Sequence, residues 1–410
     1  MKLQPRVKIL PSGLTLVTTP MPTESVSAVL LVKAGSRDEN QTTNGLSHFV
    51  EHMVFKGTQK WPTTQAVNKV IDATGGLFNA FTSQEHTGFW VKAAKKHLNL
   101  ALEFLYQLVF QPLLPGAELE QERGVILEEI KMRHDEPMTL AADRFISQVY
   151  GLTQLGREII GPAENIKRLQ REDFLQYMQS WYQPANMVLS VAGVKKFKVD
   201  WPIKIKGKAN ERQSLNFSQT KPQTQVIEKK IEQAHFCLGV RTFPRTHPDR
   251  YVLAVINTIL GGNTSSRLWN EIREKRGLAY YVRTNTDVYQ ETGYLVAQAG
   301  CAVDKLAETI KLTVNELEKI SAKTVSNKEL HLAKEYMTGR LALSQEDSQD
   351  VAEDFGESQL LEGRVRTLDE AVRGIEAVTA ADIHRVASRI IKHNQFNLTI
   401  VGKVQQKVYI

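Results

Sequence analysis

The sequence is poor in cysteine and contains no long apolar run. Cys237 and Cys301 are the two cysteines among 410 residues, which is too few for a disulfide framework or a thiolate metal site. Both lie in apolar surroundings, so we expect them to be core residues in a reducing compartment. No stretch approaches the ~18 apolar residues that span a bilayer, and the N-terminus lacks the apolar core of a signal peptide. These absences favour a cytoplasmic protein with no membrane partner.

The sequence also lacks blocks of like charge. It has 52 Lys and Arg against 45 Asp and Glu, a formal net charge of +7, but basic and acidic residues are interspersed. A nucleic-acid-binding protein usually gathers its excess charge into a patch. We therefore predict no nucleic-acid partner, although a weak preference for acidic partners stays open. A hydrophobic content of 42% and a charged content of 24% are those of an ordinary globular protein.

An internal duplication organises the chain. Residues 186–193 and 397–402 are apolar strands that end in glycine, and each follows a helical segment opened by an acid, Asp173 or Asp382. Thr379 stands three residues before Asp382, as in a capping box. A repeat of about 200 residues indicates two similar domains rather than a solenoid. Since strand-like and helix-like segments alternate without a regular βαβ rhythm, we predict an α+β fold whose domains each have a mostly antiparallel sheet with helices packed on it.

The predicted domain boundaries follow from composition. We place a first domain at residues 1–200, a linker at 201–222 and a related second domain at 223–410. The linker region is rich in Lys, Gln, Ser and Asn and has little helical periodicity. Within the domains we expect two strands around Pro11-Ser12-Gly13, strands at 25–33 and 88–92, and helices at 98–110, 306–320 and 328–345.

The segment His48-Phe49-Val50-Glu51-His52 is the strongest chemical signal. Residues 46–54 read as a helix, on which His48, Glu51 and His52 lie on one face at ~100° per residue. Two imidazoles one turn apart can chelate one ion, while the carboxylate between them stays close to a bound water. Zinc suits this set because it takes histidine nitrogens, has no redox demand and can keep one position open for water. The H-x-x-E-H spacing is the inverzincin signature, which occurs by chance in about one chain of this length per hundred.

A catalytic zinc needs a third protein ligand, and residues 122–129 supply the candidates. Glu122 and Glu129 are seven residues apart and share one face of a helix, whereas Glu128 points elsewhere. A charge-rich helix is usually a solvated surface. From the residues alone, the third ligand stays open.

Several ordered motifs across nearly the whole chain resemble the pitrilysin and mitochondrial processing peptidase family. In the first half they are residues 32–39 (VKAGSRDE), 45–58 (GLSHFVEHMVFKGT), 75–83 (GGLFNAFTS) and the acidic segment 122–129. In the second half they are residues 259–262 (ILGG), 266–268 (SRL) and 273–280 (REKRGLAY). The resemblance implies a short two-domain member: a zinc-dependent endopeptidase that hydrolyses peptides or unfolded protein segments with one Zn²⁺ per chain.

The resemblance also implies roles for individual residues. Glu129 becomes the third ligand beside His48 and His52, with Glu128 as its rival. Glu51 becomes the general base that activates water, and Glu122 the carboxylate that orients a ligand histidine.

For substrate binding, the resemblance implies an exposed strand edge at Asn79, Ala80 and Phe81, where a peptide could add as a further strand. It implies that Arg273 and Tyr280 of the second domain hold the substrate and stabilise the tetrahedral intermediate. From the residues alone, Asn79 reads as a turn or strand-end residue. Arg273 and Tyr280 then read as an exposed charge and an interface aromatic, on one face if their segment is helical throughout.

The chain carries both the zinc motif and the Arg/Tyr pair, at half the length of the four-domain members. We therefore expect a homodimer in which Arg273 and Tyr280 of one subunit face the zinc of the other. A heterodimer with a related inactive chain stays open. Two further alternatives are a non-catalytic core or processing subunit and a maturase that acts on one peptide precursor.

Overall fold

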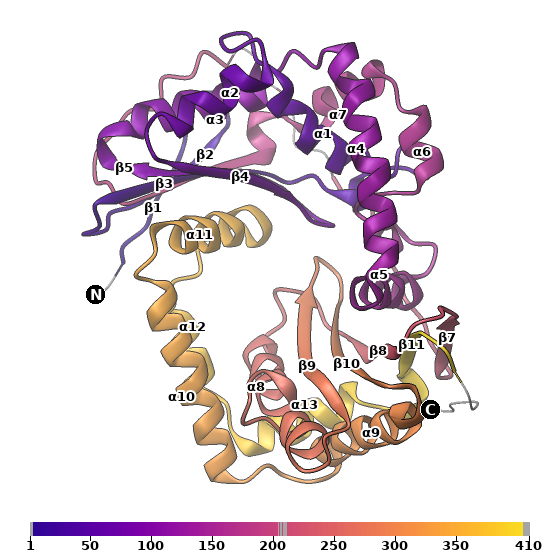
Figure 1. The fold of residues 1–410 in the computed structure, drawn as a ribbon. Helices are drawn as coiled ribbons and strands as arrows, with labels where there is room; N and C mark the ends of the chain where they lie inside the picture. The colour runs from indigo at the N-terminus through magenta and orange to yellow at the C-terminus, as the bar shows by residue number, and fades with distance from the viewer. Residues whose placement is uncertain (1–2, 204, 206, 208–210, 405–410) are drawn as a thin grey trace. The chain divides into compact units, whose positions relative to one another are not determined.

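The computed structural model describes residues 3–203, 205, 207 and 211–404, which divide into two compact units (Figure 1). Unit 1 comprises Met1–Ile130, Arg157–Gln213 and Ala342–Asp369, and unit 2 comprises Lys131–Gly156, Ser214–Leu341 and Glu370–Ile410. Each unit contains a β-sheet with helices packed on it, which confirms the predicted α+β class. No helix of the described residues is long and apolar enough to cross a bilayer.

The sheet of unit 1 has six strands among the described residues, in the order β1-β2-β6-β3-β5-β4. They are β1 (Arg6–Ile9), β2 (Thr15–Thr19), β3 (Ser25–Val32), β4 (Leu77–Thr82), β5 (Thr87–Ala94) and β6 (Met187–Ala192). Neighbours are antiparallel except β2 and β6, which are parallel. Because β4 is the last strand in this order, one of its edges is unpaired.

Helices cover both faces of this sheet, so its central strand β3 is apolar on both sides. Alternate residues of a strand point to opposite faces. Leu30 and Val32 pack in the core with α1 and α3, while Val29 and Leu31 pack with α11. The helices of unit 1 are α1 (Leu46–Met53), α2 (Thr64–Asp72), α3 (Leu98–Phe110), α6 (Ala163–Arg168), α7 (Arg171–Trp181) and α11 (Ser348–Glu362).

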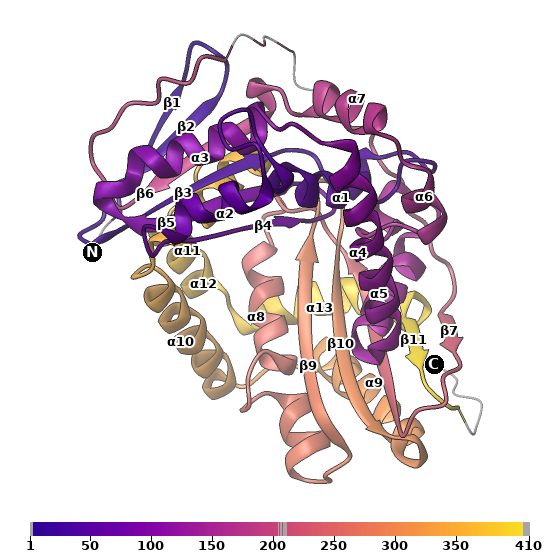
Figure 2. The ribbon, with the colours of Figure 1, turned by 45° about the horizontal axis from the view of Figure 1, so that its top comes forward.

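The sheet of unit 2 has the order β7-β11-β8-β10-β9 among the described residues, with β7 and β11 parallel and the other neighbours antiparallel. Figure 2 shows β9 and β10 side by side as a long hairpin, with α8 against β9. The strands are β7 (Gln223–Ile227), β8 (Gln233–Thr242), β9 (Ala279–Val288), β10 (Gly293–Ala302) and β11 (Asn397–Val401). The helices are α5 (Pro137–Tyr150), α8 (Arg250–Gly261), α9 (Leu306–Ala322) and α13 (Ala380–Ile390). Three further helices, α4 (Gly116–Asp135), α10 (Asn327–Ser344) and α12 (Leu368–Ala377), contain residues of both units.

The two units are not the two halves of the sequence, because each takes a helix from the other half. Helix α11 packs on β3 and β6 of unit 1 (Figure 1), where the Ser348 hydroxyl lies 2.9 Å from that of Ser27. Helix α5 packs on β8 and β11 of unit 2. The division into residues 1–200, 201–222 and 223–410 did not include this exchange, and its boundaries stay a prediction.

The local predictions of structure hold well. The strands around Pro11-Ser12-Gly13, the strands near residues 25–33 and 88–92, and the three expected helices are all present within a few residues. The capping box at Thr379 is confirmed, since its hydroxyl accepts from Asp382 N at 3.1 Å. Cys237 and Cys301 are buried and free, as predicted.

Candidate metal centre

Helix α1 carries the H-x-x-E-H motif, and its first turn is held by a buried carboxylate. Glu39 accepts hydrogen bonds from the backbone N–H groups of Gly45 (2.8 Å) and Ser47 (2.6 Å) and from Nδ2 of Asn44 (2.8 Å). Gly45 has a φ of 103°, and a Cβ there would lie 2.7 Å from the carbonyl oxygen of Ile160, so the position requires glycine. Burial raises the pKa of the Glu39 carboxyl to about 7, although the hydrogen bonds that the carboxyl accepts lower it.

Three ligand atoms converge at one side of α1. Nε2 of His48 lies 3.3 Å from Nε2 of His52, and each lies 3.8 Å from Oε2 of Glu129 on α4. Zinc–ligand distances of about 2.0–2.2 Å in a tetrahedron imply ligand separations of about 3.3–3.6 Å. The side between the two histidines lies in this range, and the two sides to Glu129 exceed it by about 0.2 Å, so a small shift of the Glu129 carboxylate fits the triangle to one zinc ion and leaves a fourth position for water. Glu128 is exposed and is not one of the three.

The imidazole of His52 is oriented by a carboxylate behind it. Its Nδ1 lies 2.8 Å from Oε1 of Glu122, and the ammonium of Lys56 pairs with Oε2 of the same carboxylate. Burial raises the pKa of the Glu122 carboxyl, but the hydrogen bonds from His52 and Lys56 outweigh it and hold the pKa below its usual range. An ionised Glu122 accepts the Nδ1 proton, which leaves Nε2 of His52 free to bind a metal.

Glu51 lies on the same helix between the two histidines. Its Oε2 accepts a hydrogen bond of 2.5 Å from the hydroxyl of Thr82, the last residue of β4. Burial raises the pKa of the Glu51 carboxyl, and the hydrogen bond from Thr82 opposes this shift. The Glu51 carboxylate therefore lies between helix α1 and β4, the edge strand of the sheet.

Asn79, Ala80 and Phe81 lie in the middle of β4, so the alternative that Asn79 is a turn or strand-end residue is wrong. The side chain of Asn79 is exposed, while those of Ala80 and Phe81 are half-buried. A strand with one unpaired edge can accept a further strand. The three residues predicted to bind substrate thus lie on a strand of the expected kind.

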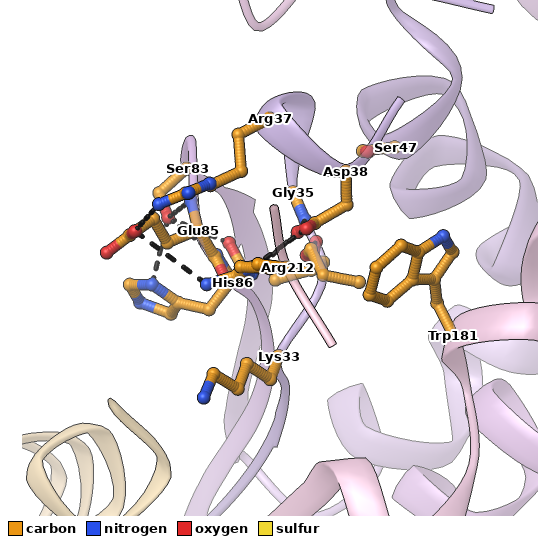
Figure 3. A network of polar contacts seen from close by, with 12 residues as sticks. Lys33, Gly35, Arg37, Asp38, Ser47, Ser83, Glu85, His86, Trp181 and Arg212 are labelled. Carbon is orange, nitrogen blue, oxygen red and sulfur yellow. Dashed lines mark hydrogen bonds and ion pairs between the residues drawn. The ribbon is translucent and has the colours of Figure 1, made fainter. Parts of the chain in front are cut away.

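A buried polar network joins the β4–β5 turn to the loop before α1 (Figure 3). Arg212 donates to both carboxylate oxygens of Asp38, at 2.7 and 2.6 Å, and Arg37 pairs with Glu85 at 2.5 Å. These four side chains are at most 4% exposed. Through Arg212, the network ties the middle of the predicted linker to the loop before α1 and to the β4–β5 turn, which follows Thr82 directly.

Arg273 and Tyr280 are neighbours within unit 2, but not on one helix. The helical turn Trp269–Glu274 ends before Gly277, whose φ of 59° reverses the chain, and Tyr280 lies in β9. The guanidinium of Arg273 donates to the carbonyl oxygen of Tyr280 and lies 4.3 Å from the ring centroid of Trp269. The ring of Tyr280 is 75% exposed, so its hydroxyl is accessible to a ligand.

Comparison with known proteins agrees with this geometry. Residues 15–163 match the family model described as insulinase (peptidase family M16), and residues 168–337 match the one described as peptidase M16 inactive domain. The chain is 33% identical over 413 residues to an uncharacterized zinc protease of Mycobacterium tuberculosis, with 98% of this chain and 93% of that protein covered. It is 34% identical over 389 residues to an uncharacterized zinc protease of Bacillus subtilis, with 92% and 94% covered. The chain belongs to peptidase family M16.

Solved structures show the M16 fold directly. A protease from Helicobacter pylori has a TM-score of 0.91 at 23% identity and covers 98% of this chain and 100% of its own. A structure described as the peptidase M16 inactive domain from Pseudomonas fluorescens has a TM-score of 0.91 at 18% identity and covers 100% of both chains. The resemblance found in the sequence is therefore confirmed for the family and the fold.

Sequence reasoning missed three residues that support this M16 site. Lys56 follows His52 by four residues, so helical spacing could have indicated its place beside Glu122. Glu39 and Thr82 lie outside α1, and no spacing rule links either of them to the metal helix. Only their hydrogen bonds, to Ser47 N for Glu39 and to Glu51 for Thr82, place them at the site.

Proposed function

We propose that this M16 chain is a zinc-dependent endopeptidase that hydrolyses peptides or unfolded protein segments, with one Zn²⁺ per chain. The observation that carries the proposal is the triangle of His48, His52 and Glu129, whose three ligand atoms are separated by 3.3 to 3.8 Å. Glu51 lies on the same helix as the two histidines. The relatives named zinc proteases support the same activity.

The residues divide the chemistry among them. Zinc, when bound, polarises the scissile carbonyl and activates water at neutral pH. Glu51 takes the proton of the attacking water as general base and returns it to the leaving amine, which is a poor leaving group without a proton. Glu122 keeps the Nδ1 proton on His52 and so presents Nε2 for metal binding.

The edge of β4 is the proposed place for the substrate. A peptide that adds to β4 at Asn79, Ala80 and Phe81 would be held by its main chain, which gives affinity with broad sequence tolerance. Arg273 and Tyr280 provide an ionised donor and an exposed phenol, which suit the stabilisation of an oxyanion. We propose that they act across a homodimer, and an active monomer in sedimentation analysis would contradict this.

The test compares wild type with Glu51→Gln in metal content and peptide hydrolysis. We expect Glu51→Gln to retain zinc, because Glu51 is not one of the three ligands, and to lose at least ~100-fold in kcat, as removal of a general base does. Glu128→Gln makes the same chemical exchange at an exposed position and should behave as wild type. If wild type binds zinc but cleaves no peptide, the alternative of a non-catalytic core or processing subunit replaces this proposal.

A further inference from the structure

We propose that Thr82 is a positioning residue for Glu51 and that it couples the base to the strand on which the peptide lies. The inference rests on the proposed function, in which Glu51 is the general base and β4 receives the substrate. Thr82 touches neither His48, His52 nor Glu129 in any described contact, so its effect would pass through Glu51.

The hydrogen bond between these two residues is specific to one carboxylate oxygen. The Thr82 hydroxyl donates to Oε2 of Glu51 at 2.5 Å, and among the described residues the carboxylate has no other hydrogen-bond partner. A glutamate side chain has three rotatable bonds and loses its rotamer freedom when it is held in one conformation. The bond to Thr82 therefore orients the carboxylate and leaves Oε1 available for the proton of water.

Backbone hydrogen bonds hold the two residues that follow Thr82, Ser83 and Gln84. In the β4–β5 turn, the carbonyl oxygen of Ser83 accepts from Ser36 N at 3.2 Å, and that of Gln84 accepts from Arg37 N at 3.0 Å. Arg37 belongs to the buried network of Figure 3, which holds this turn against the loop before α1. The C-terminal end of β4 is thus held in place independently of substrate.

The residues that precede Thr82 lie on β4, which has one unpaired edge. Asn79, Ala80 and Phe81 precede it directly, and the strand pairs only with β5 among the described strands. A peptide added at this edge supplies the main-chain hydrogen bonds that the edge lacks and so restrains the strand further. Binding of substrate would therefore also restrain the hydroxyl that orients the base.

The experiment uses Thr82→Val and Thr82→Ser in the full-length, zinc-loaded chain. Valine keeps the β-branched shape and removes the hydroxyl, whereas serine keeps the hydroxyl. Thr18→Val is the matched control, because Thr18 is also a half-buried threonine on a strand of the same sheet. The readouts are zinc content, kcat and KM on a peptide substrate, and crystal structures of wild type and Thr82→Val.

We expect Thr82→Val to keep its zinc and its KM and to lose about 10–100-fold in kcat, as loss of an orienting hydrogen bond does. Thr82→Ser should recover most of kcat, and Thr18→Val should match wild type. In the crystal structure of Thr82→Val, the Glu51 carboxylate should leave its wild-type position.

Four results would overturn the inference: an unchanged kcat in Thr82→Val, serine no better than valine, loss of zinc in Thr82→Val, or an equal loss in Thr18→Val. If wild type itself cleaves no peptide, the proposed function fails. The crystal structures then still decide this inference, because an unmoved Glu51 in Thr82→Val shows that Thr82 does not position it.

Discussion

Replacing Arg212 by methionine tests how strongly the buried network stabilises unit 1. Arg212 comes from the linker region, and its guanidinium donates to both oxygens of Asp38 and to the carbonyl oxygen of Glu85. Its side chain is 4% exposed and that of Asp38 is 2% exposed. Removal leaves two buried carboxylates, Asp38 and Glu85, with Arg37 paired to Glu85 and with Lys33 as a nearby cation that makes no ion pair with Asp38 among the described contacts.

The expected cost follows from this burial. Breaking a buried ion pair by removal of one partner costs about 3–5 kcal/mol, because the other charge is left uncompensated. Burial already raises the pKa of Asp38 despite the presence of Arg212, so Asp38 can take up a proton when Arg212 is lost. Protonation limits the penalty, and we expect Arg212→Met to lower the free energy of unfolding by about 3 kcal/mol at pH 7.

Arg385→Met is the matched control. Arg385 makes the same two-pronged contact with Asp249, at 3.0 and 2.7 Å, but its side chain is 53% exposed. An exposed pair contributes only about 0.2–1 kcal/mol after screening by solvent. The two variants thus differ mainly in burial.

Urea unfolding followed by tryptophan fluorescence is a suitable assay, since four of the five tryptophans lie in the residues of unit 1. Because Arg385 belongs to unit 2 and the two units need not unfold together, the loss in Arg212→Met is read from the tryptophans of unit 1 and the loss in Arg385→Met from Trp269 of unit 2. A loss in Arg212→Met of less than about 1 kcal/mol, or no greater than that in Arg385→Met, would refute the reasoning.

Two further predictions concern carboxylates of unit 1. Glu129→Gln should lose zinc in metal analysis while Glu128→Gln keeps it, and equal retention would remove Glu129 from the ligand set. The second prediction concerns Glu39, whose folded-state pKa of about 7 lies above the usual 4.5. Between pH 4.5 and pH 7, the Glu39 carboxyl is therefore protonated more in the folded than in the unfolded protein. The contribution of Glu39 to stability falls as the pH rises through this range. At ~1.4 kcal/mol per pH unit, wild type should lose up to about 3 kcal/mol of unfolding free energy relative to Glu39→Gln between pH 5 and pH 8. If the difference in unfolding free energy between wild type and Glu39→Gln is the same at pH 5 and pH 8, this prediction is wrong.

Helix α1 and the spacing of its two histidines and Glu51 could be predicted because they depend on residues close together in the chain. Helical geometry alone puts His48, Glu51 and His52 on one face, and the capping box at Thr379 needs only Asp382, three residues further on in the first turn of the helix. The choice of Glu129 over Glu128 came from the family resemblance. In the structure, Oε2 of Glu129 on α4 lies 3.8 Å from Nε2 of each histidine, and the role of Glu129 as ligand stays a prediction.

Other parts of the site depend on contacts between distant segments. Thr82 meets Glu51 across 31 positions of sequence, and Arg212 meets Asp38 across 174. Such contacts follow from how the sheet, the helix and the linker pack together, and no periodicity in the sequence encodes them. The same holds for α5 and α11, which pack on sheets built mostly from the other half of the chain.

By itself, the sequence determined the local elements, the duplication and the spacing of His48, Glu51 and His52 on one helix, because propensity, periodicity and residue spacing act over a few residues. Only the tertiary structure decided which distant side chains complete the site: the hydroxyl of Thr82 on Glu51, the carboxylate of Glu39 at the start of α1, and the ammonium of Lys56 beside Glu122. The physical reason is that burial and hydrogen-bond geometry are set by packing in three dimensions.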